Sequence, residues 1–220
     1  MHAVSTQNMV KIGVLAIQGS FAEHIEVLSR INVPAIEVRT VEELNSVDGL
    51  IIPGGESTTI GKLMKYYGLD KEIIKRATLP SRSSKNEREL GASALTIWGT
   101  CAGAILLAKQ VAEPRPDILG LLDISITRNA YGPQIESFET TISIPKISKK
   151  KVGAVFIRAP KITRVGKGVE VLGVLKFGQY DEPVIVQYNN LLASTFHPEL
   201  TNDTSVHEYF VSLTRTYAKK

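Results

Sequence analysis

The chain has 220 residues, of which 43% are hydrophobic and 22% charged, and these proportions exclude both a disordered and a membrane-embedded chain. The net charge is +4, a basic excess too small for a sequence-independent nucleic-acid binder. One cysteine rules out an intramolecular disulfide, and no apolar run approaches the roughly 18 residues of a membrane span. We therefore expect one cytoplasmic domain over 1–220, with a loose N-terminus at 1–9.

The first half of the chain alternates short apolar segments with amphipathic ones. Apolar runs of strand length predict buried strands at 11–17, 34–38, 48–53 and 94–98. Helical spacing of apolar residues predicts helices at 21–31, after Thr40, across 60–67, at 70–78 and at 102–109. The polar segment 80–91 is predicted to be an exposed loop. This alternation predicts an α/β fold, with a parallel sheet covered by helices on both faces.

Helix boundaries are also suggested by local signals. Ser20 and Thr40 are each followed three residues later by a glutamate, the spacing of a capping box. Ser57 is a third candidate cap, and Gly68 is placed to end the helix that Ser57 would begin.

The second half contains short strands separated by turn residues. They are predicted at 121–128, 138–144, 152–158, 170–175, 183–188 and 191–196. We expect these strands to form antiparallel hairpins added to the parallel sheet. A helix at about 203–217 is predicted to close the chain, and the lysines at 149–151 are expected in a solvated loop.

Cys101 is the candidate nucleophile. It stands between a predicted strand and a predicted helix, within the pattern Gly99-x-Cys101-x-Gly103. This is the nucleophile-elbow pattern with sulfur in place of the serine oxygen, because a sharp strand-to-helix turn needs small residues around the nucleophile. The start of a helix also favours a thiolate. A lone cysteine is more often a buried core residue, but the glycines and the junction favour the nucleophile here.

A thiolate nucleophile usually works with a base and a group that orients the base. Of the four histidines, His2 is in the loose terminus, whereas His24 and His207 are in predicted helices, as surface or packing residues. His197 follows a predicted strand and precedes Glu199 by two residues, so an extended backbone would place both side chains on one side. We therefore predict a Cys-His-Glu triad.

The turn at 53–57 is a candidate oxyanion loop, because Gly54 and Gly55 can turn backbone N–H groups inward without a Cβ clash. It follows a predicted strand, so it should lie at the same edge of the sheet as Cys101, with the N–H of Ala102 as a second donor. Taken alone, it would be read as an ordinary strand-to-helix turn. It lacks the lysine of a phosphate-binding loop, and no residue spacing suggests a metal site or a cofactor.

These residues belong to a set of motifs that runs along nearly the whole chain. The motifs are LAIQG at 15–19, EH at 23–24, PGGESTT at 53–59, WGTCAG at 98–103, RNAYGPQ at 128–134, IRAP at 157–160 and FHPEL at 196–200. Together they resemble the glutaminase subunits of pyridoxal 5'-phosphate synthase, which are triad-type (class I) glutamine amidotransferases. The cysteine and His-x-Glu motifs specify the superfamily, whereas the GGES, RNAYGPQ and IRAP segments point to this family.

The resemblance implies a flavodoxin-like three-layer α/β fold and the hydrolysis of L-glutamine to L-glutamate and ammonia. It assigns Cys101 as nucleophile, His197 as general acid and base, and Glu199 as the orienting residue. It assigns glutamine binding to Gly55, Glu56, Ser57, Arg128, Ile157 and Arg158, and a place near the oxyanion loop and the partner interface to Gln18. The partner implied is a (β/α)8-barrel synthase subunit that receives the ammonia and makes pyridoxal phosphate, a form of vitamin B6.

Other interpretations remain open from the sequence. The chain could be the glutaminase of another amidotransferase, such as imidazole glycerol phosphate synthase, or a cysteine hydrolase or deglycase on a related scaffold. It could also be a non-catalytic regulatory subunit. The loop at 80–91 and the basic run at 146–151 are not part of any family motif.

Overall fold

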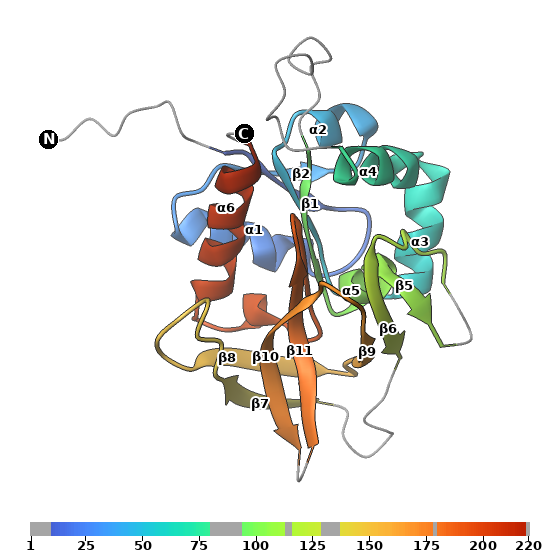
Figure 1. Cartoon of the computed structure of the whole chain (residues 1–220). Coiled ribbons are helices and arrows are strands. Elements are labelled where there is room, and N and C mark those ends of the chain that lie inside the picture. The colour runs from blue at the N-terminus through green and yellow to red at the C-terminus, as the bar shows by residue number, and fades with distance from the viewer. Residues whose placement is uncertain (1–9, 80–93, 113–115, 129–136, 178–179, 219–220) are drawn as a thin grey trace, which may run out of the picture.

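A seven-stranded sheet with the strand order β10-β11-β12-β4-β3-β1-β2 forms the centre of the computed structural model (Figure 1). The structure describes residues 10–79, 94–112, 116–128, 137–177 and 180–218, so the predictions for 1–9 and 80–91 lie outside the described residues. The strands of this sheet are β1 (Ile12–Leu15), β2 (Ala35–Val38), β3 (Gly49–Ile52), β4 (Thr96–Thr100), β10 (Glu170–Phe177), β11 (Tyr180–Tyr188) and β12 (Leu191–Ser194).

The sheet is mostly parallel, as predicted. Strands β2, β1, β3, β4 and β12 pair in parallel, and β11 and β10 extend the sheet as an antiparallel hairpin. Because the parallel strands point the same way, the loops that follow Leu15, Ile52, Thr100 and Ser194 leave the same edge of the sheet.

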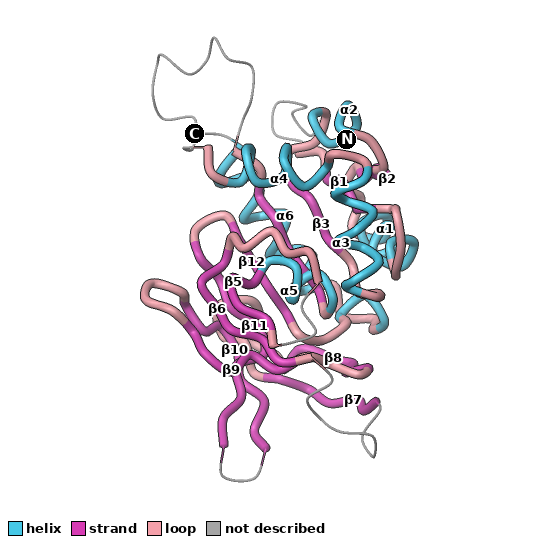
Figure 2. Tube along the Cα trace, turned by 90° about the vertical axis from the view of Figure 1, so that its right-hand side faces the viewer, coloured by secondary structure: helices cyan, strands magenta, loops and turns pink. Residues whose placement is uncertain are grey.

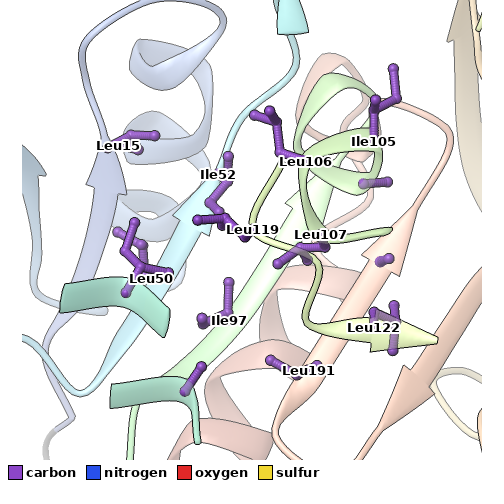
Figure 3. Packing of buried hydrophobic residues seen from close by; sticks show 14 of the residues in the cluster. Leu15, Leu50, Ile52, Ile97, Ile105, Leu106, Leu107, Leu119, Leu122 and Leu191 are labelled. Carbon is purple, nitrogen blue, oxygen red and sulfur yellow. The ribbon is translucent and has the colours of Figure 1, made fainter. Parts of the chain in front are cut away.

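Helices cover both faces of the sheet. One face carries α1 (Phe21–Arg30) and α6 (Ser205–Ala218), and the other carries α2 (Val41–Asn45), α3 (Ser57–Tyr66), α4 (Leu69–Ala77) and α5 (Ala102–Leu107) (Figure 1). Neighbouring residues along a strand point to opposite faces, so each strand contributes to both cores. Leu50 and Ile97 pack in the core beneath α2–α5 (Figure 3), whereas Ile51 and Trp98 pack in the core beneath α1 and α6. The predicted fold class is therefore confirmed.

Two smaller sheets come from the second half of the chain (Figure 2). One contains β5 (Ala108–Val111), β6 (Leu122–Thr127) and β9 (Lys161–Val165), and the other pairs β7 (Ser137–Ile142) with β8 (Val152–Ile157). The predicted helix at 102–109 is wrong in its last residues, because the chain leaves the helix after Leu107 and pairs in parallel with β6. Strand β9 lies outside the predicted strands; it is an edge strand whose structure depends on antiparallel pairing with β6.

Two of the three predicted caps are wrong. Thr40 forms the predicted capping box with Glu43 at the start of α2. Ser20 makes no side-chain cap bond; its backbone N–H instead donates to the carbonyl of Gly54, which fixes the entry to α1. Ser57 is the buried first residue of α3, and Glu56 is the cap. Gly68 follows the end of α3 with a φ of +70°, as a helix terminator should.

Among the described residues, no helix combines the length and apolar character needed to cross a bilayer. The lysines at 149–151 are exposed between β7 and β8, as predicted.

Candidate active site

Cys101 lies in a sharp turn between β4 and α5. Its φ of 48° and ψ of −101° are unusual for a residue with a side chain, and its backbone N–H donates to the carbonyl of Ser194 at 2.8 Å. Such a conformation persists where the surrounding structure holds it, and it is common at active sites. The hydrogen bond anchors the turn to the end of β12, the strand that leads to His197.

The two glycines beside Cys101 are required by close backbone contacts. A Cβ at Gly99 would lie 2.4 Å from the carbonyl oxygen of Gly103, and a Cβ at Gly103 would lie 2.0 Å from that of Ile52. The elbow pattern therefore reflects how tightly the start of α5 packs against β3 and β4, as the spacing predicted.

His197 lies directly before a short 3-10 helix, Pro198–Leu200. Its backbone N–H donates to the carbonyl of Val155 at 2.8 Å, which ties the residue to β8. Its Nδ1 lies 2.7 Å from Oε1 of Glu199, and its side chain lines the same cavity as Cys101. The three predicted residues therefore meet, but the predicted reason is wrong. The 3-10 turn, and not an extended backbone, brings the carboxylate to the imidazole.

This arrangement favours the charged imidazole. Burial lowers the pKa of His197, but the hydrogen bonds and charges of Cys101 and Glu199 outweigh it and raise that pKa to about 10. Burial likewise opposes ionisation of Glu199, yet His24 and His197 lower its pKa below the ordinary value. The structure therefore stabilises an imidazolium next to a carboxylate.

The loop at 53–57 packs directly on this group. A Cβ at Gly54 would lie 2.3 Å from the ring of His197, so only a glycine fits there. A Cβ at Gly55 would lie 2.5 Å from Oε1 of Gln18, and the same oxygen accepts the N–H of Glu56 at 2.8 Å. Gln18 is thus close to the loop, where the resemblance places it.

A cavity of about 470 Å³ opens above these residues. Those that line it are Ser20, Gly55, Glu56, Ser57, Cys101, Ala102, Ile105, Arg128, Ile157, Arg158, His197 and Leu200. The lining contains all the residues predicted to bind glutamine, together with Cys101, His197 and Ala102. Gly54, Gln18 and Glu199 are not among the lining residues. Ser20, Ile105 and Leu200 were not predicted to line the site, although Ser20 directly follows the motif at 15–19 and Leu200 ends the motif at 196–200.

Glu56 and Arg128 form an ion pair at the rim of the cavity, with 3.2 Å between Oε1 and Nη2. Glu56 also caps α3 by accepting the backbone N–H groups of Thr58 and Thr59. Burial raises the pKa of Glu56, but these hydrogen bonds lower it to about 2. Residues 129–134 of the RNAYGPQ motif lie outside the described residues.

Of the two predicted alternatives for His24 and His207, surface or packing, the structure shows packing. Both are fully buried, on α1 and α6, and His24 lies 3.6 Å from Glu199. One signal was available in the sequence. His24 is one helical turn before Leu28, on the apolar face of α1, where a polar side chain needs a partner.

Within the described ranges, no group of three or more His, Cys, Asp or Glu side chains could hold a metal ion.

Comparison with known proteins identifies the family. The model of the SNO glutamine amidotransferase family matches residues 14–216. A pyridoxal 5'-phosphate synthase subunit PdxT from Thermotoga petrophila is 44% identical over 94% of this chain and 100% of its own length. A protein of the same name from Chloroflexus aggregans is 47% identical over 92% of this chain and 99% of its own.

Solved structures agree with this assignment. A crystal structure described as a glutamine amidotransferase superposes with a TM-score of 0.79 and 46% identity, covering 92% of this chain and 98% of the other. PurLQS from Thermotoga maritima has the same fold, with a TM-score of 0.61 at 14% identity, and covers 93% of this chain and 98% of the other. The chain therefore belongs to the SNO glutamine amidotransferase family.

Proposed function

We propose that this protein is the glutaminase subunit of a pyridoxal 5'-phosphate synthase. It hydrolyses L-glutamine to L-glutamate and ammonia and passes the ammonia to a (β/α)8-barrel subunit that makes the vitamin. Family membership and the names of the relatives support the activity and the pathway. The observation that carries the chemistry is the meeting of Cys101 and His197 in the lining of one cavity, with Glu199 hydrogen-bonded to His197 at 2.7 Å. The protein acts as one domain in the cytoplasm.

In the proposed reaction, the thiolate of Cys101 attacks the side-chain amide carbon of glutamine. The carbonyl oxygen becomes an oxyanion, and the carbon–nitrogen bond breaks as His197 gives its proton to the departing ammonia. A glutamyl thioester remains on Cys101. His197 then takes a proton from water, whose oxygen attacks the thioester, and glutamate and the thiolate are released. Glu199 fixes the imidazole and stabilises its charged form throughout.

The oxyanion is stabilised by backbone N–H groups of the two loops that meet at Cys101. We assign Ala102, at the first turn of α5, and one N–H of the Gly54–Gly55 segment as its donors. Loss of one such donor typically costs about 3 kcal/mol of barrier, on the order of a hundredfold in rate.

The cavity wall provides polar groups for the amino acid end of glutamine. Glu56, Ser57, Arg128 and Arg158 all line it. Because a carboxylate pairs well with a guanidinium and an ammonium with a carboxylate, we assign these residues, with Gly55 and Ile157, to substrate binding. The ion pair between Glu56 and Arg128 holds a carboxylate and a guanidinium side by side in the cavity lining.

Docking of the barrel subunit is expected to activate the site. Gln18 holds the N–H of Glu56, so a partner that contacts Gln18 can reorient the peptide between Gly54 and Gly55, where glycine makes rotation sterically easy. We expect weak glutaminase activity from the isolated chain and a marked rise when the barrel subunit is added.

The test is a glutaminase assay on wild type and Cys101→Ala, each with and without the barrel subunit. Wild type should release glutamate, and acid-quenched samples should carry one glutamyl group on Cys101 by mass spectrometry. Cys101→Ala should lose both while keeping its unfolding temperature and its binding to the barrel. Full activity in Cys101→Ala would overturn the mechanism. Equal wild-type rates with and without the barrel would overturn the activation, and no glutamine hydrolysis in the complex would overturn the proposed function.

A further inference from the structure

Behind the candidate triad lies a buried pair of histidines that the proposed mechanism does not use. His24 on α1 and His207 on α6 each have 0% exposure. Both rings make edge-on contacts with Trp98 of β4, with centroid separations of 5.5 Å and 4.9 Å. Burying two imidazoles in an apolar core is unfavourable unless their nitrogen atoms are hydrogen-bonded.

The two rings continue the series of contacts that begins at Cys101. Nδ1 of His24 lies 2.9 Å from Nε2 of His207. On its other side, Nε2 of His24 lies 3.3 Å from Oγ1 of Thr100 and 3.6 Å from Oε2 of Glu199. The other oxygen of Glu199, Oε1, is bound to His197. The carboxylate is therefore held between two histidines, one facing each oxygen.

The surroundings determine which ring nitrogens carry protons. Within the described residues, Oε2 of Glu199 and Nδ1 of His207 have no hydrogen-bond partner within normal distance. If His24 donated from Nδ1, a bare Nε2 would face the carboxylate, and His207 would bury an N–H without an acceptor. If His207 donates from Nε2, then Nε2–H of His24 faces both Oγ1 of Thr100 at 3.3 Å and Oε2 of Glu199 at 3.6 Å, and the unpartnered Nδ1 of His207 carries no proton. The second arrangement leaves no buried N–H unsatisfied, so it is the favoured one.

We propose that His24, oriented by His207, is a positioning residue that holds the carboxylate of Glu199 in place for His197. This inference rests on the proposed function, because Glu199 matters only if His197 moves protons. A carboxylate buried to 5% exposure needs a donor for each oxygen to remain ionised and fixed. His197 supplies one donor, and Nε2–H of His24 supplies the other.

The charged groups around the pair are consistent with neutral imidazoles. Burial lowers the pKa of His24 despite the charges of Glu199 and Glu23. Burial, helped by the charge of Arg30, lowers the pKa of His207 well below its ordinary value. A neutral His24 donates a hydrogen bond to the carboxylate without adding a charge that would compete with His197.

Two amide substitutions separate this role from simple packing. His24→Gln places its amide nitrogen close to the position of Nε2 and keeps a donor for Glu199. The shorter His24→Asn places its amide near Nδ1 and leaves Oε2 without a donor. In the complex with the barrel subunit, His24→Asn should lower kcat by about tenfold with KM unchanged, because a hydrogen bond to a charged group is lost. His24→Gln should restore most of that rate.

The pH profile gives a second readout. Without its donor, the carboxylate is held less firmly beside His197, so the imidazolium loses its proton at a lower pH. The alkaline limb of kcat/KM should therefore move to lower pH in His24→Asn and stay in place in His24→Gln. Phe210→Leu is the packing control. Phe210 is on α6 and packs against Trp98 of β4. Phe210→Leu should therefore lower the unfolding temperature and leave the alkaline limb of kcat/KM unchanged.

Alkylation of the sole cysteine tests the pair without the glutaminase reaction. The rate of Cys101 modification by iodoacetamide near neutral pH should fall several-fold in His24→Asn and not in His24→Gln or Phe210→Leu. Equal behaviour of the two His24 variants, or rate losses that only follow the unfolding temperatures, would overturn the proposal. If wild type hydrolyses no glutamine but alkylation depends on His24 as stated, the proposed function fails and the positioning role of His24 stands.

Discussion

The charge on His197 is set by its neighbours on both sides. Its Nδ1 is hydrogen-bonded to Glu199, and its side chain shares the cavity lining with Cys101; burial lowers its pKa, but these two neighbours outweigh burial and raise that pKa to about 10. The proposed chemistry needs this proton twice, first to give it to ammonia and then to recover it from water.

Replacing Glu199 with glutamine tests this balance. Glu199→Gln keeps the size of the side chain but removes the negative charge that stabilises the imidazolium. We expect kcat to fall by roughly a thousandfold or more, as when the orienting carboxylate is neutralised in other triads. The pKa of His197 should decrease, so the alkaline limb of kcat/KM should move to lower pH. An unchanged profile measured over the pH range would contradict the role of Glu199.

At the scale of elements, the residues that begin some helices contribute to stability, whereas those that begin others line the site. Thr40 caps α2 with a complete capping box and does not line the cavity. The start of α1 has no side-chain cap, and its Ser20 lines the cavity and binds Gly54 through its backbone. The capping-box pattern therefore predicts the geometry at Thr40 correctly. At Ser20 the geometry is determined instead by the loop that contains Gly54.

A pair of alanine substitutions should show this difference. Thr40→Ala should lower the free energy of unfolding by about 1 kcal/mol, because a helix loses its cap, and should leave glutaminase activity unchanged. Ser20→Ala should cost less than about 0.5 kcal/mol, because no side-chain cap is lost. Urea unfolding measures both values. A larger cost for Ser20→Ala than for Thr40→Ala would contradict the observed capping.

At the scale of the whole molecule, the core between the sheet and helices α1 and α6 links stability to pH. His24 and His207 have pKa values below 6.5 in the folded protein because they are buried. Below pH 6.5 the unfolded chain takes up protons that the folded protein does not, so stability falls as the pH falls. His197 acts in the opposite direction. Its raised pKa contributes stability that is fully present below pH 6.5 and is lost as the pH rises through about 10.

The free energy of unfolding should therefore decrease toward acid pH from about 6.5. Each histidine that stays neutral when folded adds about 1.4 kcal/mol per pH unit to the slope. His207→Gln, which cannot titrate, should make the slope shallower by about that amount. Denaturant unfolding at a series of pH values measures it, and an unchanged slope in the variant would show that His207 does not resist protonation in the folded protein.

Local patterns determined much of this protein from the sequence alone. Short apolar runs separated by amphipathic segments specify the parallel sheet and its helices. The spacing of buried side chains along the sequence differs between a strand and a helix, so this spacing indicates which element forms. The glycines at 99 and 103 indicated the turn at Cys101, because a Cβ at either position would collide with backbone. The motifs at 53–59 and 196–200 identified residues that the fold brings to one cavity.

The tertiary structure decided what depends on contacts between distant segments. Strands β5 and β9 exist through their pairing with β6, which no local period records. The residue that faces Oε2 of Glu199 is His24, at 3.6 Å and from a distant part of the chain, and Nδ1 of His24 in turn lies 2.9 Å from Nε2 of His207. A histidine in an amphipathic helix reads as surface or packing. The rings of His24 and His207 come within hydrogen-bond distance of each other only because α1 and α6 pack around Trp98.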